Sequence, residues 1–390
     1  MEGDLISINI KLRPLSWLYG IGVGFRNLLF EAGILKSQAF ATPVISVGNI
    51  TVGGTGKTPH VEYLIRLLKD KTNLAVLSRG YKRKSHGFVL GDDHTTMYDL
   101  GDEPFQMKQK FPDITVAVDK KRTRGISNLI HGAAGKDIDV ILLDDAFQHR
   151  YVKPGINILL VDYHRLIIYD ELLPSGRLRE PASSKNRADI VIVTKCPTDM
   201  KPMEFRVLTK AMALYPYQQL YFSTFTYEHL EPLFGEGGLE RLEDLADQHV
   251  LLLTGIGSPE QMRLDLEPYA KELKPLAFAD HHQFKEKDIL LINETFSSLP
   301  SPRCIITTEK DAVRLKAIEG LSDEVKQHLY VLPIRIKIML DQDLSFNKYI
   351  IDYVRKNSRN SLLAQGKDDD KSQDSDHTGN RPRTISFRNY

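Results

Sequence analysis

A glycine-rich turn followed by lysine and threonine has the strongest consequences for the fold. It reads VGNITVGGTGKT at residues 47–58, directly after an apolar segment typical of a strand and directly before a segment typical of a helix. Such a turn lets consecutive backbone N–H groups point at anionic oxygens, and the helix N-terminus adds positive potential. The pattern therefore predicts a phosphate-binding loop rather than a turn that only starts a helix.

Two side chains of this loop have specific expected roles. Lys57 would reach the β- and γ-phosphates of a nucleotide, and the Thr58 hydroxyl would bind Mg²⁺. The usual spacing of such loops places glycine at position 51, where this chain has Thr51, but the small residues nearest the phosphates are kept. The expected nucleotide-binding residues are Thr51, Val52, Gly53, Gly54, Thr55, Gly56, Lys57 and Thr58.

Around the loop, short apolar runs alternate with longer mixed segments, as in parallel strands joined by crossover helices. Several runs are continuously apolar, which is expected of strands buried on both faces. We expect an α/β fold: a P-loop NTPase-like, mostly parallel sheet with helices on both faces, plus a smaller C-terminal α/β domain. The candidate strands are 43–48, 74–78, 115–118, 139–144, 156–162 and 189–195, with helices at 58–70 and 103–110.

A chain of 390 residues is long enough for two domains of roughly 150 residues each, with room for extensions. An aromatic stretch at 217–234 predicts a strand pair or linker between a kinase-like domain at 41–216 and a smaller α/β domain at 235–355. We expect residues 1–40 to form an apolar, helical segment that is a candidate for contact with a membrane surface. Residues 356–390 are charged and poor in apolar side chains, so we expect a disordered tail without a catalytic role.

Two carboxylates stand where the predicted strand at 139–144 ends. In open parallel sheets, ligands bind at the carboxyl edge of the strands. Asp144 and Asp145 lie at that edge, where an acidic residue can hold Mg²⁺ directly or through water. Solvated loop residues or a helix cap are the alternative. Together with the glycine-rich loop, the pair predicts a site for a nucleoside triphosphate, such as ATP, with Mg²⁺.

Phosphoryl transfer to an acceptor also needs a group that orients and deprotonates the acceptor. Asp102, in the turn GDEP that precedes a predicted helix, is one candidate, although a helix cap is its ordinary role. The run Asp280-His281-His282 is the other candidate, and it could equally form a structural hydrogen bond.

Composition limits the partners. With 52 Lys+Arg against 51 Asp+Glu, the net charge of +1 gives no field that would favour nucleic acid, and no feature indicates a protein partner. The two cysteines, Cys196 and Cys304, are too far apart in sequence to indicate a disulfide framework or a zinc cluster.

Residues 12–35 are the most apolar stretch of the chain. The uncharged run between Arg13 and Arg26 covers only 12 residues, whereas a membrane-spanning helix needs about 20. Leu15, Leu18, Tyr19, Leu28 and Leu29 could form an apolar face. The segment therefore predicts either a helix that lies on a membrane surface or a helix that docks on the protein's own core.

The motifs, taken in order, resemble those of the bacterial tetraacyldisaccharide 4'-kinases, the lipid A 4'-kinases. They are VGNITVGGTGKTP, LSRGYKR, GDEP, DDAFQHR, LLPSGRLREP, LLTGIGSPEQM, FADHH and TTEKD, and they span the chain from Val47 to Asp311. The resemblance implies transfer of the γ-phosphate of ATP to the 4'-hydroxyl of a tetraacylated glucosamine disaccharide 1-phosphate. It also implies a peripheral enzyme at the cytoplasmic face of the inner membrane, with the active site in a cleft between two domains joined by a two-stranded β linker.

Roles follow from the same resemblance. Asp102 is similar to the family's catalytic base, and His281, which directly follows Asp280, is favoured over His282 as its partner. Asp144 and Asp145 are similar to the residues associated with magnesium. Residues lining the nucleotide and substrate cleft would be Arg79, Tyr81, Gln148, His149, Arg179 and Glu180.

Two segments depart from the family pattern. Residues 165–170 read RLIIYD where a turn resembling Phe-Gly-Asn-Gly is expected, and Ala146 replaces a glycine whose backbone freedom could matter. A P-loop GTPase, a metal-chaperone ATPase switch and a non-catalytic membrane scaffold are the rival classes. The strand at 189–195 lacks the Asn-Lys-x-Asp that reads guanine, which weakens the GTPase interpretation.

Overall fold

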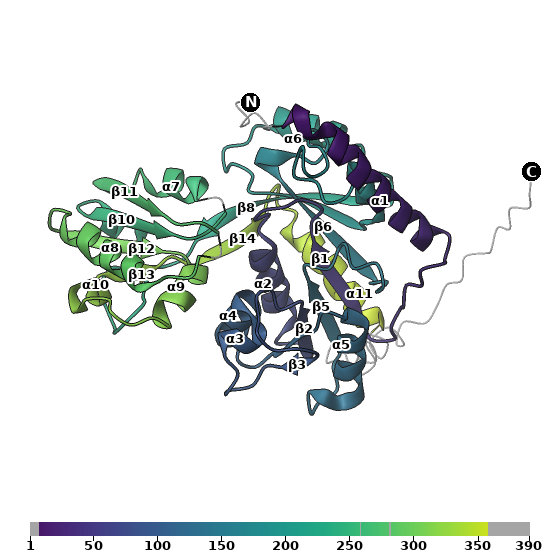
Figure 1. The fold of residues 1–390 in the computed structure, drawn as a ribbon, viewed down its shortest axis with the longest axis horizontal. Coiled ribbons are helices and arrows are strands. Elements are labelled where there is room, and N and C mark those ends of the chain that lie inside the picture. Colours follow the sequence, from purple (N-terminus) through teal and green to yellow (C-terminus); the bar gives the residue numbers. More distant parts are fainter. Residues whose placement is uncertain (1–7, 258, 281, 358–390) are drawn as a thin grey trace, which may run out of the picture.

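The computed structural model describes residues 8–257, 259–280 and 282–357, which form two α/β units built on separate sheets (Figure 1). The larger sheet has nine strands, parallel except for one antiparallel strand at each edge. In spatial order they are β14 (Ile334–Ile338), β8 (Gln219–Tyr227), β7 (Ile190–Thr194), β6 (Ile156–Asp162), β1 (Val44–Gly48), β5 (Val140–Asp144), β2 (Leu74–Ser78), β4 (Thr115–Val118) and β3 (Val89–Leu90).

Helices cover both faces of this sheet because its strands are apolar on both sides. Ile45 and Val47 of β1 face one cluster, whereas Val44 faces another. The first face is covered by α2 (Lys57–Leu68), α4 (Asp102–Lys110) and α11 (Asp343–Asn357), and the second by α5 (Arg122–Asn128) and α6 (Pro202–Met212). The expected P-loop-like α/β fold is confirmed. Short helical segments complete the unit: α3 (Met97–Leu100), η2 (Leu129–Ala133), η3 (Tyr163–Arg165) and η4 (Ala182–Arg187).

The smaller unit has a sheet of five strands, parallel except for its short edge strand. Its order is β11 (Glu272–Ala277), β10 (His249–Thr254), β12 (Arg303–Thr307), β13 (Leu329–Val331) and β9 (Glu231–Pro232). Its helices are η5 (Leu242–Leu245), α7 (Glu260–Leu266), α8 (Glu286–Ser297), α9 (Glu309–Lys316) and α10 (Asp323–Gln327), and they pack on two apolar clusters, one on each face of the sheet.

A two-stranded ribbon connects the units. The first half of β8, 219–222, pairs in parallel with β7, and its second half, 223–227, continues beyond β7 and pairs antiparallel with β14. After β14 the chain adds α11, whose buried Phe346, Ile350 and Val354 pack in the cluster of the large sheet. The structure therefore places 334–357 with the larger unit, whereas the sequence division assigns residues up to 355 to the smaller one.

The N-terminal helix α1 (Arg13–Glu31) follows the turn η1 (Ile10–Leu12) and lies along the outside of the larger unit (Figure 1). Only Ser16, Asn27 and Phe30 of α1 are buried. It is anchored by polar contacts, since Ser16 Oγ donates to the carbonyl of Leu172 at 2.9 Å. Within the described ranges, no helix combines the length and the apolar character needed to cross a membrane.

Candidate active site

The glycine-rich loop joins β1 to α2 at the carboxyl edge of the large sheet. Its backbone needs glycine, because Gly53 has φ 115° and Gly56, which precedes the first residue of α2, has φ 79°. A side chain at Gly56 would also approach the ring of Phe225 to 3.3 Å. Asn49 Nδ2 donates to Thr55 Oγ1 at 2.9 Å and holds the loop closed from within. The loop predicted from the sequence thus joins β1 to α2 through a backbone that requires glycine at two positions.

A cleft between the two units opens onto this loop. Residues 54–59 line it on one side, and Ile256, Gly257, Asp280 and Lys310 of the smaller unit line it on the other. Phe225 of the ribbon lies at its base. A ligand held by the loop would therefore also be in contact with the smaller unit.

Asp144 is the last residue of β5, and its carboxylate is buried where a charge is unfavourable. Only 1% of the residue is exposed, and Ser78 Oγ donates to its Oδ2 at 3.1 Å, while Oδ1 has no hydrogen-bond partner among the described residues. Burial, reinforced by the nearby charges of Glu103 and Asp145, raises the pKa of Asp144 to about 7. A buried carboxylate oxygen without a donor is what a cation site requires.

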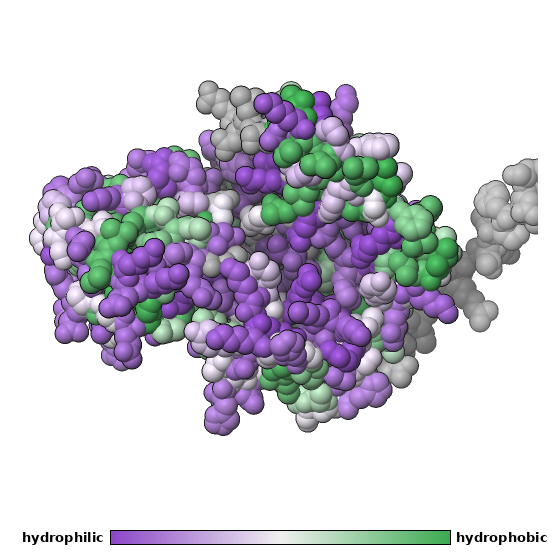
Figure 2. Space-filling view, in the orientation of Figure 1, coloured by the Kyte–Doolittle hydropathy of each residue, from purple (hydrophilic) through white to green (hydrophobic). Residues whose placement is uncertain are grey.

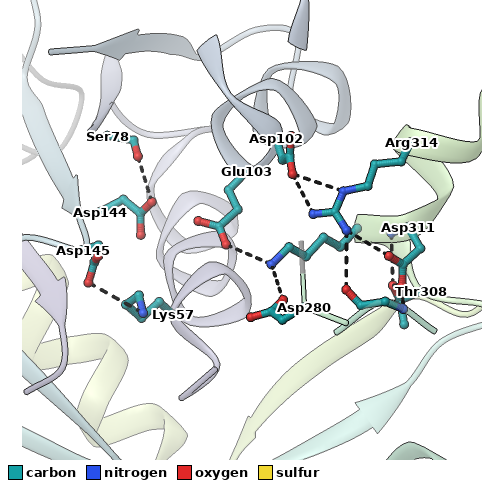
Figure 3. A network of polar contacts seen from close by, with 12 residues as sticks. Lys57, Ser78, Asp102, Glu103, Asp144, Asp145, Asp280, Thr308, Asp311 and Arg314 are labelled. Carbon is teal, nitrogen blue, oxygen red and sulfur yellow. Dashed lines mark hydrogen bonds and ion pairs between the residues drawn. The ribbon is translucent and has the colours of Figure 1, made fainter. Parts of the chain in front are cut away.

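Asp145 faces the loop directly. Its Oδ1 lies 3.6 Å from Lys57 Nζ (Figure 3) and 3.8 Å from Arg179 Nη2. Asp145 itself has a left-handed backbone, at φ 47°. Ala146 does not have a positive φ, so replacement of the expected glycine by Ala146 causes no backbone strain. The glycine that this segment does need is Gly48, because a Cβ there would lie 2.7 Å from the backbone nitrogen of Phe147.

These residues fit a magnesium ion that also binds phosphate oxygens. Within the described part of the chain there is no group of three or more His, Cys, Asp or Glu side chains that could form a complete metal site. Mg²⁺ in nucleotide enzymes typically takes one or two carboxylates, with phosphate and water oxygens completing its shell. Asp144, Asp145 and the Thr58 hydroxyl at the start of α2 would supply the protein share.

Asp102 is the first residue of α4 and lies at the interface between the units. Arg314 of α9 donates to its Oδ2 through Nη2 at 2.6 Å and Nε at 3.1 Å (Figure 3). Beside this pair, Lys310 Nζ lies 3.4 Å from Glu103 and 3.3 Å from Asp280. Asp102 is thus bonded to the smaller unit, and its neighbour Glu103 lines the cleft.

Of the two predicted histidines, the structure describes only one. His281, favoured as the partner of Asp102, lies outside the described residues. His282 Nε2 is 2.9 Å from Asp288 Oδ2, and its ring stacks on Phe278 with centroids 4.8 Å apart. Both contacts lie within the smaller unit, so His282 is engaged in holding the start of α8.

The predicted cleft residues divide into two groups. Arg179 supports the phosphate loop, because its Nε donates to the carbonyl of Thr51 at 3.0 Å and its Nη2 to Asn49 Oδ1. Glu180 is buried and paired with Arg187, and Arg26 of α1 lies 3.6 Å from it.

The second group lies farther along the edge of the sheet. Arg26 also donates to the carbonyl of Gln148 at 3.0 Å. The pKa of His149 falls to about 4, first because of burial and then because of Arg122, Arg26 and Arg79, so this ring is neutral at physiological pH. Tyr81 and Arg79, which follow β2, are exposed.

Two arginines were not found by sequence reasoning. Arg122 of α5 is 2% exposed and donates to the carbonyls of Asp119 at 2.6 Å and Asp144 at 3.0 Å, which brings a cation behind the carboxylate pair. Burial lowers its pKa to about 10, so it stays charged. Arg314 is the other. Its only sequence signal is its position three residues after Asp311 of the TTEKD motif, on the same helix face.

Comparisons with known proteins agree with this geometry. The family model described as tetraacyldisaccharide-1-P 4'-kinase matches residues 8–355. Proteins named tetraacyldisaccharide 4'-kinase from Phocaeicola vulgatus and Bacteroides thetaiotaomicron are 60% and 51% identical, over 93% and 94% of this chain and 99% and 98% of their own lengths.

A solved structure is also similar. The crystal structure of LpxK from Aquifex aeolicus in complex with ATP superposes with a TM-score of 0.65 at 29% sequence identity, over 87% of this chain and 98% of that one. The resemblance inferred from the eight motifs is confirmed. This chain belongs to the family of tetraacyldisaccharide-1-P 4'-kinases.

Proposed function

We propose that this protein transfers the γ-phosphate of ATP to the 4'-hydroxyl of a tetraacylated glucosamine disaccharide 1-phosphate, which gives the 1,4'-bisphosphorylated lipid of lipid A synthesis. The observation that carries the proposal is the joint lining of one cleft by the phosphate loop, residues 54–59, and by the smaller unit, which also holds Asp102 through Arg314. Family membership supplies the substrate class.

The loop and its neighbours bind and orient the nucleotide. Amides of residues 53–58 would cradle the β- and γ-phosphates, and Lys57 would exchange its contact with Asp145 for the phosphate oxygens. Arg179 keeps the loop in shape and lies near the same carboxylate. Asp144, Asp145 and Thr58 would hold Mg²⁺, which when bound offsets phosphate charge in the transition state.

Asp102 is the proposed base for the acceptor. A sugar hydroxyl is almost fully protonated at neutral pH, so a carboxylate that accepts its proton assists as the bond from oxygen to the γ-phosphorus forms. The bond between the γ-phosphorus and the β-phosphate oxygen breaks, and ADP leaves with the electron pair. The proton passes to Asp102, and Arg179 and Lys57 offset charge on the transferring group.

The surface of α1 supports a place at the membrane. Figure 2 shows hydrophobic side chains gathered over α1, next to the larger unit. Trp17 is 70% exposed, and spacings of four, four and three residues align it with the exposed Ile21, Phe25 and Leu28. Leu15 and Leu18 are exposed as well. Such a helix buries its apolar face at the boundary of headgroups and acyl chains. The protein would act as a peripheral enzyme on the cytoplasmic face of the inner membrane, where its acylated substrate resides.

The helix also contacts three residues that the family resemblance predicts to line the nucleotide and substrate cleft. Tyr19 OH donates to the carbonyl of Arg179 at 2.9 Å, and Arg26 contacts both Gln148 and Glu180. A lipid whose acyl chains stay at the membrane could therefore present its sugar beside the phosphate loop, because α1 contacts Arg179, which in turn bonds Thr51 of that loop.

A direct assay tests the proposal. Purified protein is incubated with γ-labelled ATP, Mg²⁺ and the disaccharide 1-phosphate in mixed micelles, and labelled bisphosphorylated lipid is the expected product. Lys57→Met should lower kcat by about 100-fold or more, since it removes charge compensation at the transferring phosphate. The control Lys71→Met changes an exposed lysine after α2 and should retain the wild-type rate. Wild-type protein that hydrolyses ATP but leaves the lipid unlabelled would instead favour a nucleotide switch.

A further inference from the structure

Arg314 makes a side-chain bond between the units that ends on the proposed base. Its guanidinium comes from α9 of the smaller unit, and the side chain is 4% exposed. Nη2 and Nε both donate to Asp102 Oδ2, at 2.6 and 3.1 Å. Both bonds end on the same carboxylate oxygen, and charge-assisted bonds of this kind are among the strong ones. They hold the Asp102 side chain in one place at the start of α4.

Arg314 is itself held rigidly inside the smaller unit. Its Nη1 donates to Asp311 Oδ1 at 3.1 Å, and the Asp311 side chain is fully buried. Asp311 in turn accepts from the backbone nitrogen of Gly255 at 2.8 Å and from Thr308 Oγ1 at 2.7 Å. These contacts tie the guanidinium to the end of β10 and to the start of α9 (Figure 3). A side chain at Gly255 would lie 2.8 Å from Asp311 Oδ1, so this close approach needs glycine.

The other side of the bond is equally fixed. Gly101 precedes Asp102 with φ 91°, and a Cβ on Gly101 would lie 2.7 Å from the carbonyl oxygen of Tyr81. This close packing sets where α4 begins and hence where the Asp102 side chain starts. The helix N-terminus favours the ionised carboxylate, but it does not select a rotamer. Arg314 supplies that selection.

We propose that Arg314 is a positioning residue for phosphoryl transfer. The inference rests on the proposed function, in which Asp102 accepts the proton of the acceptor hydroxyl. Arg314 holds the Asp102 carboxylate in its working position while the smaller unit is docked on α4, so that the base is in place only when the cleft is assembled. The family-motif residues Asp311 and Thr308 act by holding Arg314.

The experiment compares three single variants in the lipid-kinase assay. Arg314→Met removes the charge and both bonds to Asp102, and we expect kcat to fall by about 30- to 100-fold while KM for ATP stays within about threefold. Arg314→Lys keeps a cation beside Asp311 but loses the two guanidinium N–H groups that both donate to Asp102. Its kcat should therefore recover only in part, to about one tenth of wild type. Arg303→Met is the control, because Arg303 is a partly buried arginine of the smaller unit whose partner Glu324 belongs to the same unit. It should retain the wild-type kcat.

A double variant separates positioning from stability. In an Asp102→Asn background, Arg314→Met should change the residual kcat by less than about threefold, because residues that act as a unit are not additive. A merely structural Arg314 would lower kcat by the same factor in both backgrounds, and that result would overturn the proposal. If Arg314→Met does not fold, Arg314→Lys decides: a kcat within twofold of wild type overturns the role of Arg314.

The assay also separates this inference from the proposed function. Wild-type protein that fails to label the lipid disaccharide would overturn the proposed function and this role with it. An active wild type with an unchanged Arg314→Met kcat would overturn the role of Arg314 alone.

Discussion

At the scale of single residues, the buried carboxylate of Asp144 destabilises the folded protein when it is ionised, and the same carboxylate is proposed to bind Mg²⁺. Its pKa of about 7 lies above the ordinary value of 3.8, chiefly because the carboxyl is buried. Between pH 3.8 and about pH 7, the native state therefore keeps the proton on Asp144, whereas the unfolded chain has released it. The associated stabilisation is fully present below pH 4 and is lost as the pH rises toward 7. Magnesium would compete with that proton and offset the buried charge.

Replacing this carboxylate should stabilise the protein and disable it. In the absence of nucleotide and Mg²⁺, Asp144→Asn should raise Tm by about 5 °C above pH 7 and by much less near pH 4, because only the ionised form is penalised. Thermal unfolding of both proteins across this pH range measures the difference. The lipid-kinase rate of the variant should fall by about 100-fold. A Tm difference that does not grow with pH would show that Asp144 is not the group whose ionisation opposes folding.

At the scale of elements, the sequence is informative wherever neighbours in the chain are neighbours in space. The strand expected at 139–144 is β5, Val140–Asp144, because its apolar run and terminal carboxylates are both local signals. The destination of α11 was not predictable in this way. The apolar residues on one side of α11 indicate that the helix packs on a sheet, but not on which sheet. It packs on the larger sheet because β14, which precedes it, pairs antiparallel with β8 of that sheet.

The site shows the same limit. Lys57 and Thr58 follow from one glycine-rich pattern, whereas Asp102 and Arg314 are 212 positions apart and meet only because two sheets dock. Charge pairs of this kind leave no periodic trace, since a single long-range contact can join almost any two surface positions. The residue types were visible in the sequence, but the partners were not.

The N-terminal helix allows a test at the same scale. Exchanging Trp17, Ile21 and Phe25 for serine or glutamine should reduce binding to vesicles that contain anionic phospholipid by about 10- to 100-fold, because burial of each large apolar side chain contributes about 1.5–3 kcal/mol and the interface captures part of it. Vesicle sedimentation measures this loss. These side chains are exposed, so the Tm should change little.

A matched control makes the helix test specific. Leu344 is 77% exposed at the start of α11, away from α1 in the chain and on another element, so Leu344→Gln should leave vesicle binding unchanged. Sedimentation of the α1 triple variant at the wild-type level would contradict a membrane role for this face of the helix.

At the scale of the whole molecule, the two units are joined by a narrow ribbon and by charges. The antiparallel part of β8 and β14 is the covalent bridge (Figure 1). Polar side chains of α4 and α9 also join the units. Lys110 of α4 lies 2.7 Å from Glu62 of α2 and also bonds Glu309 of the smaller unit. Glu62 is buried, and its pKa is raised first by burial and then by the charge of Glu309. Lys110 thus keeps two carboxylates together across the interface.

Removing this lysine should open the molecule. In Lys110→Met the carboxylates of Glu62 and Glu309 face each other without their shared cation, and we expect a loss of about 1–3 kcal/mol in interface stability. Small-angle X-ray scattering without nucleotide should then give a larger radius of gyration than the wild type. Lys108→Met, on the same helix, removes only a contact with the carbonyl of Pro112 and should scatter like the wild type. Adding Glu309→Gln to Lys110→Met removes the repulsion, so it should restore the compact form. If the double variant stayed as open as the single one, repulsion between these carboxylates would not be what separates the units.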